Sequence, residues 1–400
     1  MKLVTPASAM YSRELLRVSF QRLRVGARVL ISAPYRRYRL NKVKNERSIA
    51  TPNGIDSLES HILGHEKQWI LVRGRDTNSP VMLFLQGGID TPAFINVSLL
   101  GIKARLEESF VMVYWERRGI GKSYHRNFPK QTVNVEQTVA DVHELSELLR
   151  RRFARERIYL AGHSWGAAMA MLAASRRPDL YHAVINSGQV VNTTEDVTMN
   201  YQFAVDEAVK TGNREAIKEL NETGTPPYDY FRHLIYSKWA ARFRGVSYSI
   251  APKSLPKPGG PTAGDNTFDD NGNGSILARA GARLKGLLYA EPIVPEYSLK
   301  DAFNIAVRPD FSMKCIGEGF YDVNLFRQVP EIDVPVYFIQ GRYERITPPE
   351  IVERYYNHLR APKGKHLVWF ETSAHAPYMK DPQQFNNVVV NTVLKETYRP

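Results

Sequence analysis

Short apolar runs alternate with amphipathic segments along most of the chain. The runs predict strands at 68–73, 81–86, 110–115, 158–161, 183–188, 334–340 and 366–370. Two of them, 81–86 and 110–115, are apolar without alternation, which is typical of strands buried on both faces of a parallel sheet. Apolar residues at helical spacing predict helices at 139–153, 351–359 and 382–398. The pattern therefore predicts an α/β fold in which helices flank a mostly parallel sheet.

The alternation stops near residue 190 and returns at residue 334. Residues 195–220 have the spacing of one or two helices, and residues 228–243 are rich in aromatic side chains. Residues 252–275 are rich in Pro, Gly, Asp and Asn and are predicted to form a flexible loop. We divide the chain into four parts: a basic N-terminal arm (1–48), a first core segment (49–190), an inserted helical segment (191–318) and a last core segment (319–400).

The formal net charge of +13 is concentrated in the arm. Residues 1–48 hold twelve Lys or Arg against two Glu and so carry +10, whereas the other 352 residues carry +3. A nucleic-acid partner is therefore not expected. Five apolar residues of the arm recur at helical spacing beside a stripe of arginines: Leu16, Phe20, Leu23, Ala27 and Leu30. This amphipathic helix fits three roles: contact with an anionic membrane surface, organelle targeting, or packing on a protein surface.

Few features suggest export or a bound metal. No apolar stretch of signal-peptide type precedes a cleavage site, so the expected location is cytoplasmic or peripheral at a membrane, with organelle targeting left open. The single Cys315 excludes an intramolecular disulfide and a multi-cysteine metal site. Residues 269–274 match half of a calcium loop, but Ala280 stands where a bidentate Glu is required. We expect neither a metal nor an organic cofactor, and the oligomeric state stays open.

The strongest chemical signal is Gly162-His163-Ser164-Trp165-Gly166, which lies between a predicted strand and an alanine-rich helix. A serine in this context sits at the tip of a sharp turn and can act as a nucleophile. It needs a base within hydrogen-bond reach and an acid that orients the base. The order Ser, acid, His predicts Ser164, Glu344 and His375, because the last two follow strands near the C-terminus.

Other residues compete for these roles. Asp333 and Asp322 are alternatives to Glu344 as the acid. His163 lies beside the nucleophile but is expected to point elsewhere. The oxyanion of the reaction is predicted to be held by the backbone N–H groups of Trp165 and of Gly88, which follows the strand at 81–86.

Five segments together resemble the proline iminopeptidase-like branch of the α/β-hydrolase superfamily over roughly residues 50–400. They are Gln86-Gly87-Gly88, the run Trp115-Glu116-Arg117-Arg118-Gly119-Ile120-Gly121-Lys122-Ser123, Gly162-His163-Ser164-Trp165-Gly166, Gly341-Arg342-Tyr343-Glu344 and Ser373-Ala374-His375. The resemblance implies an α/β-hydrolase fold, a helical lid at the inserted segment, and a serine hydrolase that forms an acyl-enzyme. Its substrate is expected to be a small molecule or a short peptide.

The chain departs from that branch at four places. Gln86-Gly87-Gly88-Ile89-Asp90 replaces the usual His-Gly-Gly-Pro-Gly, Glu116-Arg117-Arg118-Gly119 replaces Asp-Gln-Arg-Gly, and Glu344 replaces the usual Asp. The lid motif Trp-x-x-Trp-Glu has its nearest match in Trp239-Ala240-Ala241-Arg242-Phe243, where an arginine would repel a substrate ammonium.

The aromatic residues of the insertion have two interpretations. Phe231, Tyr236 and Trp239 either line a substrate pocket or form a small core of their own. The resemblance favours hydrolysis of an amide or peptide bond, and the lid departures favour a carboxylesterase or lactonase acting on a small hydrophobic ester. An acyl-transfer or cyclisation catalyst and a binding protein with a degenerate site are the further alternatives.

Overall fold

The structure is a computed structural model that describes residues 27, 38, 40–243, 294–308 and 310–398. The described residues form two compact units. The larger contains 47–200 and 310–398, and the smaller contains 201–243, 294–308 and the described residues before 47. Most of the predicted arm and the whole predicted loop at 252–275 lie outside the described residues. Among the described helices, none is long and apolar enough for a membrane crossing.

The larger unit is built on an eight-stranded sheet in the order β1-β2-β4-β3-β5-β6-β7-β8. The strands are β1 (Ile55–Leu63), β2 (Glu66–Gly74), β3 (Val81–Leu85), β4 (Val111–Glu116), β5 (Ile158–His163), β6 (Tyr181–Ser187), β7 (Val336–Gly341) and β8 (Lys365–Phe370). β1 and β2 are antiparallel to each other, and β2 is antiparallel to β4. All pairings from β4 to β8 are parallel, so the predicted mostly parallel sheet is confirmed.

β1 is the strand that the sequence pattern does not predict. It lies at the edge of the sheet, and its side chains alternate between half-buried and exposed. An edge strand with one solvated face carries many polar residues, so it lacks the continuous apolar run of the central strands. By contrast, β3 and β4 are buried at every position.

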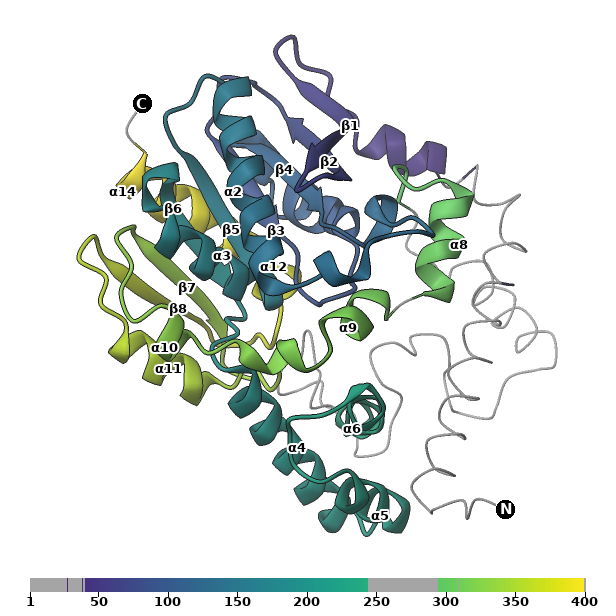
Figure 1. Cartoon of the computed structure of the whole chain (residues 1–400). Coiled ribbons are helices and arrows are strands. Elements are labelled where there is room, and N and C mark those ends of the chain that lie inside the picture. The colour runs from purple at the N-terminus through teal and green to yellow at the C-terminus, as the bar shows by residue number, and fades with distance from the viewer. Residues whose placement is uncertain (1–26, 28–37, 39, 244–293, 309, 399–400) are drawn as a thin grey trace, which may run out of the picture. The chain divides into compact units, whose positions relative to one another are not determined.

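Helices pack against the sheet in two groups (Figure 1). One group contains α2 (Val135–Arg152), α3 (Trp165–Arg176), α10 (Leu325–Gln328) and α11 (Pro349–His358). The other contains a π-helical segment at Val97–Lys103, α12 (Pro377–Lys380), α13 (Pro382–Asn386), a second π-helical segment at Asn387–Leu394 and α14 (Lys395–Thr397). The helices predicted at 139–153, 351–359 and 382–398 are confirmed. The carboxyl ends of the parallel strands are left free for loops that carry chemistry.

The smaller unit is helical among its described residues. The predicted one or two helices at 195–220 are α4 (Thr193–Lys210) and α5 (Arg214–Thr223), and α4 begins in the larger unit. They are followed by α6 (Tyr230–Arg242) and α8 (Leu299–Val307). The short helix α9 (Phe311–Ile316) belongs to the larger unit.

A buried ion pair joins the loop after β4 to helix α2. Arg118 donates from Nε and Nη2 to the two carboxylate oxygens of Asp141 at 2.7 and 2.8 Å. Both side chains are almost fully buried. Gln68 and Gln137 also donate to this carboxylate, at 2.7 and 3.0 Å, so Asp141 is well satisfied.

Breaking this pair should destabilise the fold strongly. We expect Arg118→Met to lower the free energy of unfolding by about 3–5 kcal/mol, because the Asp141 carboxylate would remain buried without its cation. Arg118→Met combined with Asp141→Leu should recover most of that loss, since no buried charge remains. Urea denaturation of the two variants measures both values. A loss below about 1 kcal/mol in the single variant would contradict the expectation.

Candidate active site

Ser164 stands at a strained turn between a strand and a helix. β5 ends at His163, α3 begins at Trp165, and Ser164 between them has φ 53° and ψ −119°. A positive φ is disfavoured for a residue with a side chain, so the surrounding structure must hold this conformation. The Ser164 backbone N–H donates to the carbonyl oxygen of Ser187 at 2.9 Å. The predicted strand, sharp turn and helix are confirmed.

The glycines on either side of Ser164 are required by close packing. A Cβ at Gly166 would lie 2.1 Å from the carbonyl oxygen of Leu85, the last residue of β3. A Cβ at Gly162 would lie 2.6 Å from the Cα of Ala167. The obstructing atoms belong to the backbone, so no side-chain movement can relieve either overlap. Only glycine therefore fits at both ends of this turn.

Glu344 and His375 follow β7 and β8 and are in contact. Nδ1 of His375 lies 2.7 Å from Oε2 of Glu344, and both side chains are buried. Oε1 of Glu344 accepts hydrogen bonds from the backbone N–H groups of Arg345, Ile346 and Thr347 at 2.7, 2.6 and 3.2 Å. The carboxylate is fixed at both oxygens, and it holds the imidazole ring in turn.

The end of β6 lies between the serine turn and the histidine loop. Ser187 accepts the hydrogen bond from the Ser164 backbone, and a Cβ at the next residue, Gly188, would lie 2.8 Å from the carbonyl oxygen of His375. Of the alternative acids, Asp333 is exposed and forms an ion pair with Lys363, with 3.3 Å between Nζ and Oδ2. The structure therefore brings Glu344, rather than Asp333, to the imidazole.

The prediction that His163 points away from this region is wrong. Its ring centre lies 4.7 Å from that of His375 and 5.2 Å from that of Tyr378. The reason is that Nδ1 of His163 is held 3.2 Å from both the carbonyl oxygen and Oγ of Ser187. Burial, followed by the neighbouring His375, lowers the pKa of His163 well below its ordinary 6.5. A neutral imidazole therefore packs against His375.

The two predicted oxyanion donors lie on segments that adjoin Ser164. Trp165 is the first residue of α3, where backbone N–H groups have no acceptor within the helix. Gly88 follows β3 in a turn and has φ 64°. A Cβ at Gly87 would lie 2.9 Å from the Cβ of Ser164, so this turn packs directly against the serine.

The chain is similar in sequence to aminopeptidases. The family model Hydrolase_4, described as Serine aminopeptidase, S33, matches residues 103–218. The Probable aminopeptidase YbaC of Bacillus subtilis (strain 168) is 29% identical over 82% of this chain and 93% of its own length. The Proline iminopeptidase of Heyndrickxia coagulans is 25% identical over 78% of this chain and 89% of its own length.

A solved structure has the same fold. The proline iminopeptidase-related protein of Thermus thermophilus superposes with a TM-score of 0.51 at 17% identity, covering 86% of this chain and 98% of its own. The chain has the α/β-hydrolase fold. The predicted α/β-hydrolase fold and the resemblance to the proline iminopeptidase-like branch are confirmed, and the role of the inserted segment as a lid stays a prediction. The relatives and the family model also show that this α/β-hydrolase is an enzyme.

Three predicted substrate-binding residues of this α/β-hydrolase lie on α6 in the smaller unit. Trp239 is fully buried there and donates from Nε1 to Oε2 of Glu219 at 2.7 Å. Tyr236 is also buried, and its ring packs 5.5 Å from that of Tyr228. Phe231 is partly buried. Trp239 and Tyr236 thus contribute to the core of their own unit, and contact of the three residues with a substrate stays a prediction.

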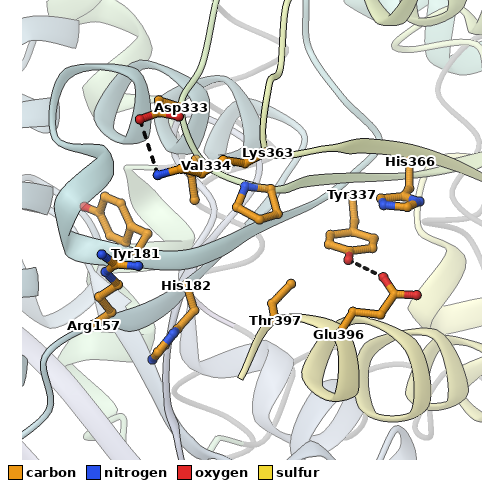
Figure 2. A pocket seen from close by; sticks show the side chains of 11 residues that line it. Arg157, Tyr181, His182, Asp333, Val334, Tyr337, Lys363, His366, Glu396 and Thr397 are labelled. Atoms are coloured by element: carbon orange, nitrogen blue, oxygen red, sulfur yellow. Dashed lines mark hydrogen bonds and ion pairs between the residues drawn. The ribbon is translucent and has the colours of Figure 1, made fainter. Parts of the chain in front are cut away.

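A hollow of about 300 Å³ lies at the amino ends of the parallel strands, whereas Ser164 follows the carboxyl end of β5. Figure 2 shows the side chains that line it. The hollow is lined by residues at the amino ends of β6, β7 and β8 and by the C-terminal helix. Figure 2 shows two pairs in its wall, Asp333 with Lys363 and Tyr337 with Glu396. None of the predicted catalytic residues lines this hollow. It is therefore separate from the candidate site of the α/β-hydrolase.

His182, which lines the hollow, should make the stability of the protein depend on pH. Burial, with Arg157 nearby, lowers the pKa of His182 from 6.5 to about 4. The unfolded chain takes up this proton near pH 6.5, so the contribution of His182 to stability is present above that pH and is lost as the pH falls toward 4. The free energy of unfolding should therefore fall less between about pH 7.5 and about pH 4.5 in His182→Gln than in wild type. We expect a difference of about 1 kcal/mol, because the ring is only half-buried. Urea denaturation at about pH 7.5 and 4.5 tests this, and an equal pH effect in both proteins would contradict it.

Proposed function

We propose that this α/β-hydrolase cleaves an amide or peptide bond through an acyl-enzyme on Ser164. The observation that carries the proposal is the buried contact of 2.7 Å between His375 and Glu344, beside a serine held at positive φ. Glu344 orients the imidazole, and His375 acts as the base. The N–H groups of Trp165 and Gly88 hold the oxyanion.

The steps follow from which nitrogen of His375 is occupied. Nδ1–H donates to Glu344, so Nε2 is the ring nitrogen that accepts the proton of the Ser164 hydroxyl as Oγ attacks the carbonyl carbon. The tetrahedral intermediate collapses when Nε2–H protonates the leaving group. Water then attacks the acyl-enzyme by the same route, with its proton passing to Nε2 of His375. His375 returns that proton to Oγ of Ser164 as the bond between Oγ and the acyl carbon breaks and the acid product leaves.

The neutral state of His163 supports this mechanism. During acylation His375 becomes a cation, and a second cation at a ring distance of 4.7 Å would raise the energy of that state. The lowered pKa of His163 keeps its ring uncharged near neutral pH. His163 therefore packs against His375 without opposing its protonation.

The relatives favour a substrate with a free amino terminus, since one is named a probable aminopeptidase and another a proline iminopeptidase. The inserted segment favours a second candidate. Arg242 lies over the ring of Trp239 at 5.3 Å, in the segment that most resembles the lid motif with a carboxylate. A cation there disfavours an ammonium group, and a small hydrophobic ester is the substrate class that avoids this conflict.

Matched anilides separate the two candidates. The panel contains proline and alanine p-nitroanilides, their N-acetyl derivatives, and p-nitrophenyl esters of short acids. An aminopeptidase should turn over the free-amine anilides at least about tenfold faster than the acetylated ones, because the charged amine contributes to binding. Turnover of both anilides at equal rates would contradict recognition of the amine. Turnover of the esters alone would assign the enzyme to the carboxylesterase class.

A further inference from the structure

The Gly87-Gly88 turn carries one proposed oxyanion donor, and its sequence leaves it free to move. Two successive glycines have a wide range of φ and ψ, and this freedom must be removed before the Gly88 N–H can point at a fixed place. A donor acts only when it stands about 3 Å from the developing oxyanion. The turn therefore needs external support under the proposed function, on which the inference rests.

Arg117 contacts this turn from the loop after β4. Its Nη1 donates to the carbonyl oxygen of Gln86 at 2.8 Å, and its Nη2 donates to the carbonyl oxygens of Ile89, at 2.8 Å, and Gly88. The guanidinium is planar and buried, so one rigid group ties three carbonyls of the turn. The carbonyls of Gln86 and Gly88 flank the peptide that carries the Gly88 N–H. That peptide is therefore held from both sides.

Asp90 anchors the other end of the turn. Its carboxylate oxygens accept hydrogen bonds from the backbone N–H groups of Ser312 and Met313 in α9, at 2.6 and 3.0 Å. Burial raises the pKa of Asp90 to about 6 and lowers the pKa of Arg117 to about 10, and the attraction between the two charges offsets part of each shift. Near pH 7 both groups are therefore charged, and the turn lies between two fixed supports.

We propose that Arg117 is a positioning residue that orients the Gly88 N–H toward the oxyanion formed at Ser164. Two of the departures from the motifs of the proline iminopeptidase-like branch meet here. Arg117 stands in place of the Gln of Asp-Gln-Arg-Gly, and Ile89-Asp90 stands in place of the Pro-Gly of His-Gly-Gly-Pro-Gly. A proline would stiffen the turn by fixing φ. In this chain the guanidinium of Arg117 and the carboxylate of Asp90 stiffen it through hydrogen bonds, so the two departures compensate for each other.

The test measures how strongly catalysis depends on the carbonyl oxygen of the substrate. Wild type and Arg117→Gln are compared on a p-nitrophenyl ester and on its thionoester, in which sulfur replaces the carbonyl oxygen. We expect Arg117→Gln to lower kcat on the ester by about 10- to 100-fold with KM changed less than about threefold. Sulfur is a weak hydrogen-bond acceptor, so the ratio of ester to thionoester kcat should fall by a similar factor.

Arg117→Lys separates charge from geometry. Lysine keeps the positive charge but cannot bind three carbonyls with a planar group, so we expect it to lose nearly as much kcat as Arg117→Gln. Full activity of the lysine variant would overturn the proposed geometry. A loss of kcat in Arg117→Gln with an unchanged ester to thionoester ratio would also overturn it, because the oxyanion contacts would then be intact.

Labelling by a fluorophosphonate probe distinguishes failure of this proposal from failure of the proposed function. Slower labelling of Ser164 in Arg117→Gln than in wild type supports both the acyl-enzyme mechanism and the positioning role of Arg117. Equal rates in the two proteins overturn the role of Arg117 alone. Absence of labelling in wild type overturns the acyl-enzyme mechanism, and the role of Arg117 with it.

Two further variants control for folding. Arg73→Gln removes another buried arginine, which lies on β2 and whose Nε contacts Oε1 of Glu107 at 2.9 Å. This variant should lower the Tm without changing the ratio of ester to thionoester kcat. Ile89→Pro added to Arg117→Gln restores a stiff residue to the turn, and we expect it to recover about tenfold in kcat. A Tm equal to wild type with no recovery would overturn the compensation between the two departures.

Discussion

Ser164→Ala is expected to lower kcat by about 10⁴- to 10⁶-fold, which is the range found when a serine nucleophile is removed. Alanine keeps the Cβ of serine, so the turn with φ 53° and its packing against Gly87 are unchanged. What is lost is the atom that forms the acyl-enzyme. Steady-state kinetics on the p-nitrophenyl ester measure the loss, and covalent labelling by the fluorophosphonate probe should disappear.

Ser175→Ala is the matched control for this prediction. Ser175 lies on the same helix, α3, and its hydroxyl only donates to the carbonyl oxygen of Leu172 at 3.1 Å. Its replacement should leave kcat and labelling at wild-type levels. Activity above about 1% in Ser164→Ala, with labelling retained, would show that another residue is the nucleophile.

The sequence predicts the part of the fold that depends on local pattern. Central strands such as β3 and β4 are continuous apolar runs. The turn at Ser164 is marked by Gly162 and Gly166, which the close packing of the backbone requires. The pattern does not predict β1, because polar residues interrupt its apolar ones and its pairing with β2 is what makes it a strand.

The candidate site is predictable in its residues but not in its contacts. Ser164, Glu344 and His375 follow strand ends, which the sequence locates. The orientation of His163 depends on Ser187, on another strand, and the contact of Arg117 with the Gly88 turn depends on two loops that meet only in the fold. Local patterns carry no information on such pairings, although the unusual Arg117 and Asp90 were visible as departures.

Glu344→Gln is expected to lower kcat by about 10³- to 10⁴-fold, although the two side chains have nearly the same shape. Oε1 of Glu344 accepts three backbone N–H groups, so the glutamine must place its carbonyl oxygen at that position. Its NH₂ group then faces Nδ1 of His375, where Oε2 now lies at 2.7 Å. The imidazole must accept at Nδ1 and carry its proton on Nε2, and it can no longer take the proton of Ser164.

The comparison with Glu344→Asp decides whether tautomer control is the cause. Aspartate keeps the charge and the acceptor, but its side chain is one methylene shorter and cannot reach both the backbone N–H groups and His375 equally well. We expect a loss of about 10- to 100-fold, from misplacement of the ring alone. The isosteric glutamine should therefore be the more damaging change. If Glu344→Asp lowers kcat more than Glu344→Gln does, tautomer control is not the cause. The distance between the acid and His375 would then set the loss of rate.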